Sequence, residues 1–96
     1  MFIIFLRFTG DKARAPQFME AHNAWLRQGF DDGVFLLAGG LEAGRGGAIL
    51  AHGTDAPAIM ARVATDPFVI EGIVSPDIQA ITPGRVDDRL SFLRAA

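Results

Sequence analysis

The sequence has no cysteine among its 96 residues, which excludes several kinds of chemistry at once. Without thiols there can be no disulfide framework, no thiolate nucleophile and no cysteine-ligated metal site. With His22 and His52 as the only histidines, a structural zinc site is not expected either. We therefore predict neither a metal nor another cofactor. The absence of cysteine also suits a reducing compartment, so the predicted location is cytoplasmic.

Basic charge and long apolar runs are scarce as well. The net charge is −2 and no basic run occurs, so nucleic acid is not expected as a partner. No apolar stretch reaches the roughly 20 residues that a membrane-spanning helix needs. The opening MFIIFLRF is interrupted by Arg7 and lacks the features of a signal peptide. We expect a strand there and no membrane partner.

Apolar residues, in contrast, are abundant for a chain of this size. Half of the residues are hydrophobic and only 21% are charged. The length predicts one domain, residues 1–96, in which 84–96 form a C-terminal extension. A single small domain would leave much of this apolar surface uncovered, and we therefore expect self-association.

The periodicity of apolar residues predicts four strands and two helices. The first strand, Phe2–Phe8, is apolar at both parities, which is typical of a central strand covered on both faces. Pro76 restricts the last strand to a sheet edge or a bulge. The other expected elements are a helix from Pro16 to about Asp32, a strand Val34–Ala38, a glycine-rich loop Leu41–Gly47, a strand Ala48–His52, a short helix capped by Thr54 and ended by Asp66-Pro67, a strand Ile73–Ile81, and a terminal helix carrying Val86, Leu90 and Leu93.

This order is βαββαβ, an α+β, ferredoxin-like arrangement with a four-stranded antiparallel sheet. Two helices can cover only one face of such a sheet. Because the first strand is apolar on both sides, the second face needs a cover too. Two chains that pair their sheets face to face would provide it, and we expect a homodimer.

His22 is the most unusual residue in the predicted helices. It lies on the apolar stripe of the first helix, where an aliphatic residue is expected; the stripe reads Phe18, Met19, His22, Trp25, Leu26 and Gly29. A titratable side chain aimed inward needs a hydrogen-bond partner or a pocket open to solvent. One interpretation is a core histidine satisfied by a backbone carbonyl. The other is a functional group.

Several segments of the chain resemble the YCII-related (YciI-like) family of the dimeric α/β-barrel superfamily. They are the hydrophobic first strand, His22 in the first helix, the run from Asp32 through Gly33-Val34-Phe35-Leu36-Leu37-Ala38 to Gly39, Asp66-Pro67-Phe68, and Glu71-Gly72. The likeness spans about residues 1–83. It implies a pocket with a His–Asp pair and metal-free acid–base chemistry on a small molecule, as in superfamily relatives that are lactone isomerases or dehydrochlorinases. Gly39 is followed here by Gly40, where the family often has proline.

The aspartate best placed to pair with His22 is Asp66. Asp31 is nine residues away, which is about 13.5 Å along a straight helix, and Asp32 is no nearer. The loop after the second helix can instead fold back over the first and bring Asp66 to His22. The alternative for Asp66 is helix termination with local turn hydrogen bonds.

Three further residues are candidates for binding a substrate. Arg7, at the end of the first strand, could bind a carboxylate, although an ion pair with Asp11 or Glu20 is the more conventional interpretation. Trp25 and Phe68 are candidates for core or pocket wall. His52 is expected in a surface turn.

Two functions of different classes follow. The first is a metal-free acid–base enzyme in which His22 and Asp66 isomerise a small organic acid, shift a lactone or eliminate HX. The second is a non-catalytic module that binds a small ligand or a protein partner as a homodimer, with His22 as an interior residue.

Overall fold

A computed structural model describes residues 1–94 of the chain. The elements follow the order β1, α1, β2, β3, α2, β4, with a short helix α3 inserted before the last strand. Their bounds are β1 Phe2–Phe8, α1 Ala15–Asp31, β2 Phe35–Gly40, β3 Gly46–Ala51, α2 Ala56–Val63, α3 Pro67–Ile70 and β4 Val74–Ala80, with 3₁₀ turns at Lys12–Arg14, Glu42–Gly44 and Asp88–Leu93.

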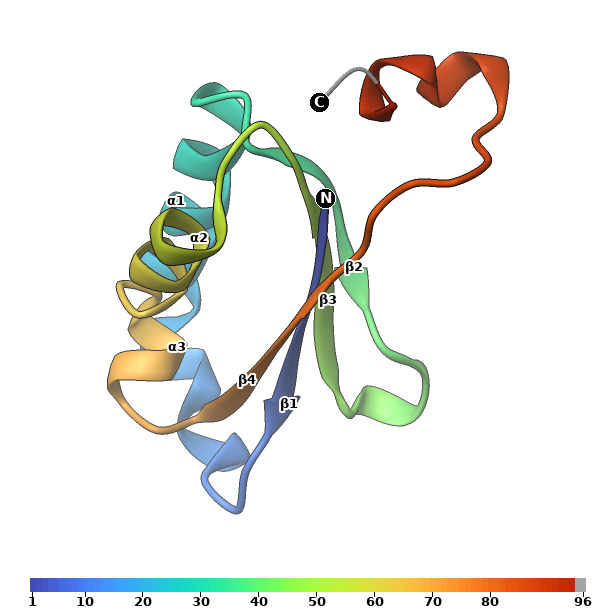
Figure 1. Ribbon diagram of the computed structural model, residues 1–96. Helices are drawn as coiled ribbons and strands as arrows, with labels where there is room; N and C mark the ends of the chain where they lie inside the picture. Colours follow the sequence, from blue (N-terminus) through green and yellow to red (C-terminus); the bar gives the residue numbers. More distant parts are fainter. Residues whose placement is uncertain (95–96) are drawn as a thin grey trace.

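The four strands form one antiparallel sheet in the order β2-β3-β1-β4. The ferredoxin-like α+β fold is therefore confirmed. β1 lies inside the sheet, as its two apolar faces predicted, and β4 lies at an edge, where Pro76 costs no hydrogen bond to a further strand. All three helices cover the same face of the sheet (Figure 1).

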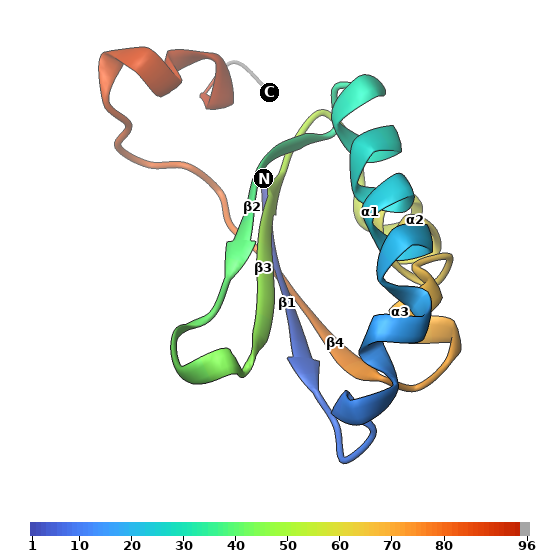
Figure 2. The same ribbon diagram turned by 180° about the vertical axis from the view of Figure 1, so that it is seen from behind.

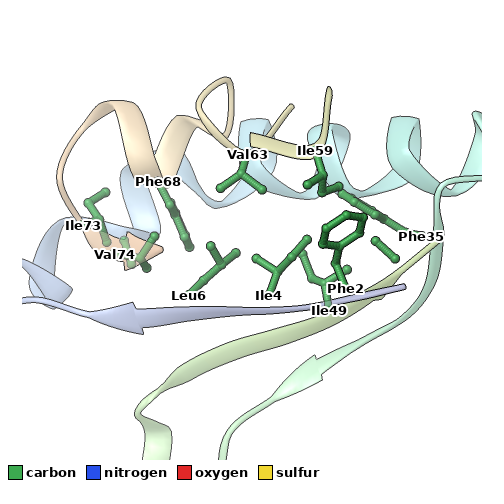
Figure 3. Close-up of a cluster of buried hydrophobic side chains, with 12 residues drawn as sticks. Phe2, Ile4, Leu6, Phe35, Ile49, Ile59, Val63, Phe68, Ile73 and Val74 are labelled. Carbon is green, nitrogen blue, oxygen red and sulfur yellow. The ribbon is translucent and has the colours of Figure 1, made fainter. Parts of the chain in front are cut away.

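The core fills the space between the helices and that face (Figure 3). Every second residue of β1 points into it: Phe2, Ile4 and Leu6 are buried, whereas Ile3 and Phe5 between them face the other side. The core is completed by residues from the helices and the neighbouring strands, among them Phe35, Ile49, Ala51, Ile59, Val63, Phe68, Ile73 and Val74.

The second face of the sheet is largely apolar and carries no helix. Ile3 and Phe5 lie in register with Leu50 and Ala48, and Leu37 lies opposite Leu50, which places all five on this face. Leu37 is 52% exposed. The C-terminal segment leaves the sheet on this side, as Figures 1 and 2 show from opposite directions, and only its Leu93 is buried among the residues of the last turn.

Three predicted element boundaries were wrong. The N-cap of α2 is Asp55 and not Thr54, because the Asp55 carboxylate accepts a hydrogen bond from the Ala58 amide at 2.9 Å. The second helix ends at Val63, and Asp66 begins α3 instead of terminating α2. The terminal segment is a kinked 3₁₀ turn, Asp88–Leu93, and not a regular helix.

The β2–β3 hairpin is longer than the sequence predicted. β2 continues through Gly39 and Gly40, and β3 begins at Gly46, so that Gly40 pairs with Gly47. The glycines had been expected to end the strands, but they remain extended because the antiparallel partner supplies their hydrogen bonds. The loop is thereby reduced to the 3₁₀ turn at Glu42–Gly44 and its flanks.

Candidate active site

A cavity of about 270 Å³ lies between α1 and the sheet, at the end of the sheet where the β2–β3 hairpin turns. Its walls are mainly apolar side chains and unsubstituted strand backbone. The lining residues are Leu6, Phe8, Met19, His22, Asn23, Leu26, Ala38, Gly39, Gly40, Gly46, Gly47, Ala48, Ile49, Phe68 and Val74. A concave, mostly apolar site with few polar groups is the usual form of a small-molecule pocket.

His22 enters this cavity from α1 and is held by Asp66. The Nδ1 atom of His22 lies 2.7 Å from Oδ1 of Asp66. The Asp66 side chain is fully buried, while 12% of the His22 side chain is exposed. The structure thus brings together the two residues that the sequence had paired, and it gives His22 a carboxylate partner in place of the backbone carbonyl of the alternative interpretation.

The position of Asp66 follows from the local sequence Asp66-Pro67-Phe68. Asp66 is the N-cap of α3, and its Oδ1 accepts a hydrogen bond from the Phe68 amide at 3.0 Å. Proline fits the first helical position because that position has no need of an amide donor. Both interpretations of Asp66 therefore hold: the carboxylate that caps the short helix also contacts His22.

Aromatic packing fixes the plane of the imidazole. The Phe68 ring stacks on His22 with centroids 4.1 Å apart and an angle of 4° between the planes. Phe68 also lines the cavity, as the sequence analysis had allowed. Because Asp66 and Phe68 belong to one turn, a single short segment sets both the position and the orientation of His22.

Trp25 supports this segment from α1 and does not line the cavity. Its indole Nε1 donates hydrogen bonds to the Arg62 carbonyl and to Oγ1 of Thr65, both at 3.1 Å. The first bond ties the end of α2 to α1. The second ties Thr65, the residue before Asp66, to α1. Trp25 is thus a positioning residue, and its predicted contact with a substrate stays without support from the geometry.

The second oxygen of Asp66 is unusual. Oδ2 is buried and has no hydrogen-bond partner within the described residues 1–94. Buried carboxylate oxygens are normally satisfied, and an orphaned one is costly. Oδ1, in contrast, has two partners, Nδ1 of His22 and the Phe68 amide, and these two contacts hold the side chain in place.

With Nδ1 bonded to Asp66, the tautomer that donates from Nδ1 leaves a lone pair on Nε2. Nε2 makes no hydrogen bond to another residue of the part of the chain that is described. Since His22 lines the cavity, Nε2 is the ring nitrogen available to a ligand. An imidazole oriented by a carboxylate in this way can act as a general base.

Arg7 lies outside the site. It follows Leu6 on β1 and therefore faces the side of the sheet without helices, where its Nη1 lies 3.0 Å from Oδ2 of Asp77. The expected partners, Asp11 and Glu20, were wrong, because β4 runs beside β1 and brings Asp77 closer. The hydrogen bonds from Arg7 and then from Gln79 hold the pKa of Asp77 below its usual value.

Replacing Arg7 with alanine is expected to raise the pKa of Asp77 toward that usual value, because the largest cause of its lowering is removed. A carboxyl group with a lowered pKa stabilises the fold above the pKa of the unfolded chain, and this contribution is lost as the pH falls. Any stability difference between wild type and Arg7→Ala should therefore vanish in acid. NMR titration of the Asp77 carboxyl carbon measures the shift, and an unchanged pKa would contradict the pairing.

Two polar residues near the cavity were missed by the sequence analysis. Asn23 lines the cavity one position after His22, and its spacing of four from Met19 could have indicated this face of the helix. The ammonium of Lys12 lies 5.2 Å above the ring of Phe8, a wall residue, and donates to the Gly44 carbonyl at 3.0 Å. Nothing in the local sequence predicts that long-range contact.

His52 lies away from the cavity, directly after β3, with its ring edge-on to Phe92 at 5.3 Å between centroids. No group of three or more metal-ligating side chains is found in residues 1–94. Within the same residues, none of the helices combines the length and apolar character needed to span a bilayer.

The sequence matches no known family model and no curated protein sequence. Among solved structures, the chain is similar to 5-chloro-2-hydroxyhydroquinone dehydrochlorinase (TftG) from Burkholderia phenoliruptrix AC1100, in its complex with 2,5-dihydroxybenzoquinone. The TM-score is 0.70 at 16% sequence identity, over 88% of this chain and 96% of that chain. A likeness at this identity shows the fold alone, the ferredoxin-like α+β arrangement described above.

Proposed function

We propose that this protein is an acid–base enzyme that acts on a small organic molecule, with His22 as the general base and Asp66 as its orienting carboxylate. The observation that carries the proposal is the 2.7 Å contact between His22 Nδ1 and a fully buried carboxylate, at a histidine that also lines a cavity. A histidine kept only for packing can be satisfied by a backbone carbonyl, whereas a fully buried carboxylate is a costly partner.

The reaction we favour is elimination of HCl from a chlorinated, hydroxylated substrate, with isomerisation of a small organic acid or lactone as a related possibility. Nε2 of His22 accepts a proton from the substrate. The electron pair left behind forms a new double bond, and the C–Cl bond breaks with its pair on the departing chloride. The substrate loses H⁺ and Cl⁻, so no oxidant or reductant is needed. In an isomerisation the same proton returns to another atom.

The Asp66 carboxylate stabilises the imidazolium that forms during this step, and the imidazolium then releases its proton to solvent. The dehydrochlorinase activity of the structural neighbour supports this choice of reaction, as analogy at the level of the fold. We further propose that the chain is YciI-like, works without a metal, and is cytoplasmic. Two of the segments that carry the resemblance, His22 and Asp66-Pro67-Phe68, contact each other, and His22 and Phe68 line the cavity.

We also propose that two copies of the chain pair through the sheet face that carries no helix. The face presents Ile3, Phe5, Leu37 and Leu50, and such a contiguous apolar surface is unfavourable in water. A second copy presents the same surface, so a two-fold arrangement is self-complementary.

Turnover of a substrate panel tests the enzyme assignment. The panel contains chlorinated hydroxyhydroquinones, with chloride release as the readout, and small lactones, with their absorbance as the readout. His22→Ala is expected to lower the rate on an accepted substrate by about 10²- to 10⁴-fold, the usual contribution of a general base. His52→Ala is the matched control, because His52 does not line the cavity, and it should retain the wild-type rate.

Equal rates for wild type and His22→Ala would overturn the role of His22. If wild type is inert across the whole panel, the enzyme assignment falls and the alternative remains, a non-catalytic module that binds a small ligand or a partner as a homodimer. Ligand binding by the cavity, measured without turnover, would then be the function left to test.

A further inference from the structure

We propose that Gly40 determines the shape of the ligand, and that the cavity admits one planar six-membered ring lying against the strand backbone at Gly40 and Gly47. This inference rests on the proposed function in so far as it concerns the same cavity. It goes further because it names the class of ligand and the residue that selects it.

Gly40 faces the cavity although it has no side chain. It lies two residues after Ala38 on β2, and Ala38 pairs with the buried Ile49. Side chains alternate along a strand, so positions 38 and 40 share the face that the helices cover. Gly47, the partner of Gly40, lies two residues before Ile49 and shares this face too. A Cβ atom at position 40 would therefore project into the cavity.

The backbone does not explain why position 40 is glycine. At Gly46, φ is +136° and a Cβ would collide with the Leu6 carbonyl, so glycine is required there. At Gly47 a Cβ would lie 3.2 Å from the Gly39 carbonyl, which is tight. At Gly40 the nearest atom to a Cβ is the Gly46 carbonyl oxygen at 3.9 Å, an ordinary contact. Alanine would fit the fold, and would favour the strand over flexible glycine.

The side chain of an alanine or valine at position 40 would occupy space in the cavity. Because Gly40 pairs with Gly47, neither of the two neighbouring strands has a Cβ atom at this place, which gives a flat surface of peptide groups on one wall. His22 lies on the opposite wall, in α1. A flat ring can lie against the peptide surface and keep a substituent at its edge within reach of the imidazole, whereas a puckered ring cannot make the same close contact.

The volume of the cavity matches a ligand of one ring. An apolar cavity of about 150 Å³ accommodates benzene. The cavity here, about 270 Å³, is less than twice that size. Its volume therefore matches one ring with its substituents. The polar side chain of Asn23 at the wall can bind a ring substituent such as a hydroxyl.

Binding of 2,5-dihydroxybenzoquinone to the intact protein tests the inference without requiring turnover. Trp25 is the only tryptophan, and its ring centroid lies 5.9 Å from that of His22, so a quinone in the cavity should quench its fluorescence. Titration of free N-acetyltryptophanamide corrects for absorbance by the ligand. We expect the quinone to quench the fluorescence of wild type in a saturable way. The puckered cyclohexane-1,4-diol should bind much more weakly, and its binding is measured by how well it displaces the quinone.

Gly40→Ala should raise the Kd for the quinone by about 10- to 200-fold, the range that one misplaced methylene group produces in a tight pocket. Gly40→Val should abolish saturable quenching. Gly10→Ala is the matched control, because a Cβ there meets nothing within 4 Å and Gly10 does not line the cavity. Thermal unfolding of each variant shows whether it is folded. If Gly40→Val does not fold, Gly40→Ala alone carries the test.

Wild-type affinity in folded Gly40→Ala and Gly40→Val would overturn the inference, as would absence of saturable quinone binding by wild type, or equally tight binding of the puckered diol. These outcomes are separate from those for the proposed function. Loss of binding in the Gly40 variants with full turnover in His22→Ala would remove the catalytic proposal and leave the ligand class standing.

Discussion

Asp66→Asn is expected to lower kcat by about 10²- to 10⁴-fold while leaving the protein folded. Asparagine is nearly the same size as aspartate and is an equally good N-cap, so the hydrogen bond to the Phe68 amide can persist. What changes is the charge, because Oδ1 is the one oxygen that faces both the Phe68 amide and Nδ1 of His22. An asparagine carbonyl in that place still accepts both hydrogen bonds, but it carries no negative charge to stabilise the imidazolium that forms when Nε2 takes a proton. Turning the NH₂ to that place instead would give up the Phe68 hydrogen bond and leave Nε2 without a lone pair, so either orientation impairs proton removal.

Asp55→Asn is a close control for this variant. Asp55 caps α2 through the Ala58 amide, just as Asp66 caps α3 through the Phe68 amide, but it does not contact His22. The two variants therefore make the same chemical change at two helix N-termini. We expect Asp55→Asn to retain wild-type kcat, and both variants to unfold at similar urea concentrations.

The nitrogen chemical shifts of the His22 ring report the tautomer directly, whether or not a substrate is known. Wild type should show the proton on Nδ1, and Asp66→Asn should keep it there when its carbonyl faces Nδ1. A proton found on Nε2 in Asp66→Asn would show that the NH₂ has turned toward the ring. Absence of the Nδ1 proton in wild type would contradict the pairing, and full activity in Asp66→Asn would contradict a role of the carboxylate in catalysis.

The pairing of His22 with Asp66 was accessible from the sequence because each residue violates a local expectation. A histidine on the apolar stripe of α1 must find a partner, and Asp31 and Asp32 are too far along the helix to provide one. Asp66 precedes a proline and so lies outside a helix, at the end of a segment that packs on α1. The family resemblance implied a His–Asp pair, and helix geometry excluded Asp31 and Asp32, which left Asp66 as the best-placed partner.

The fold was also accessible, because alternating and helical periodicities are strong in this chain. The errors occurred where short-range rules compete. Asp66-Pro67 is compatible both with the end of one helix and with the start of another. Proline disfavours helical conformation in the residue before it, but it fits the first position of a helix. Thr54 and Asp55 are both good N-caps, and only the position of the following amide decides between them.

The cavity was not accessible, because it depends on contacts between distant segments. Gly40 and Gly47 reveal their common wall only once the register of β2 and β3 is known. Arg7 illustrates the same limit: its partner, Asp77, is seventy positions away and is brought close by the pairing of β1 with β4. Local pattern identifies which residues need a partner, whereas topology decides which partner they receive.

The second large expected effect concerns two neighbouring residues of β1. Ile4→Ala should lower the free energy of unfolding by about 2–5 kcal/mol, because Ile4 is fully buried between the helices and the sheet and its removal leaves a cavity. Ile3 is only half-buried and faces the other side of the same strand. Both changes remove the same atoms at adjacent positions, so strand propensity cancels in the comparison.

Protein concentration separates the two contributions. If two chains pair through the face that carries Ile3, then Ile3→Ala weakens the dimer, and its cost appears as a stability that depends on concentration. The cost of Ile4→Ala should be the same at every concentration, because Ile4 lies inside one chain. Urea unfolding at several concentrations, together with sedimentation equilibrium, measures both. A monomeric wild type would contradict the dimer while leaving the prediction for Ile4 intact, since that one depends only on the layer of side chains between helices and sheet.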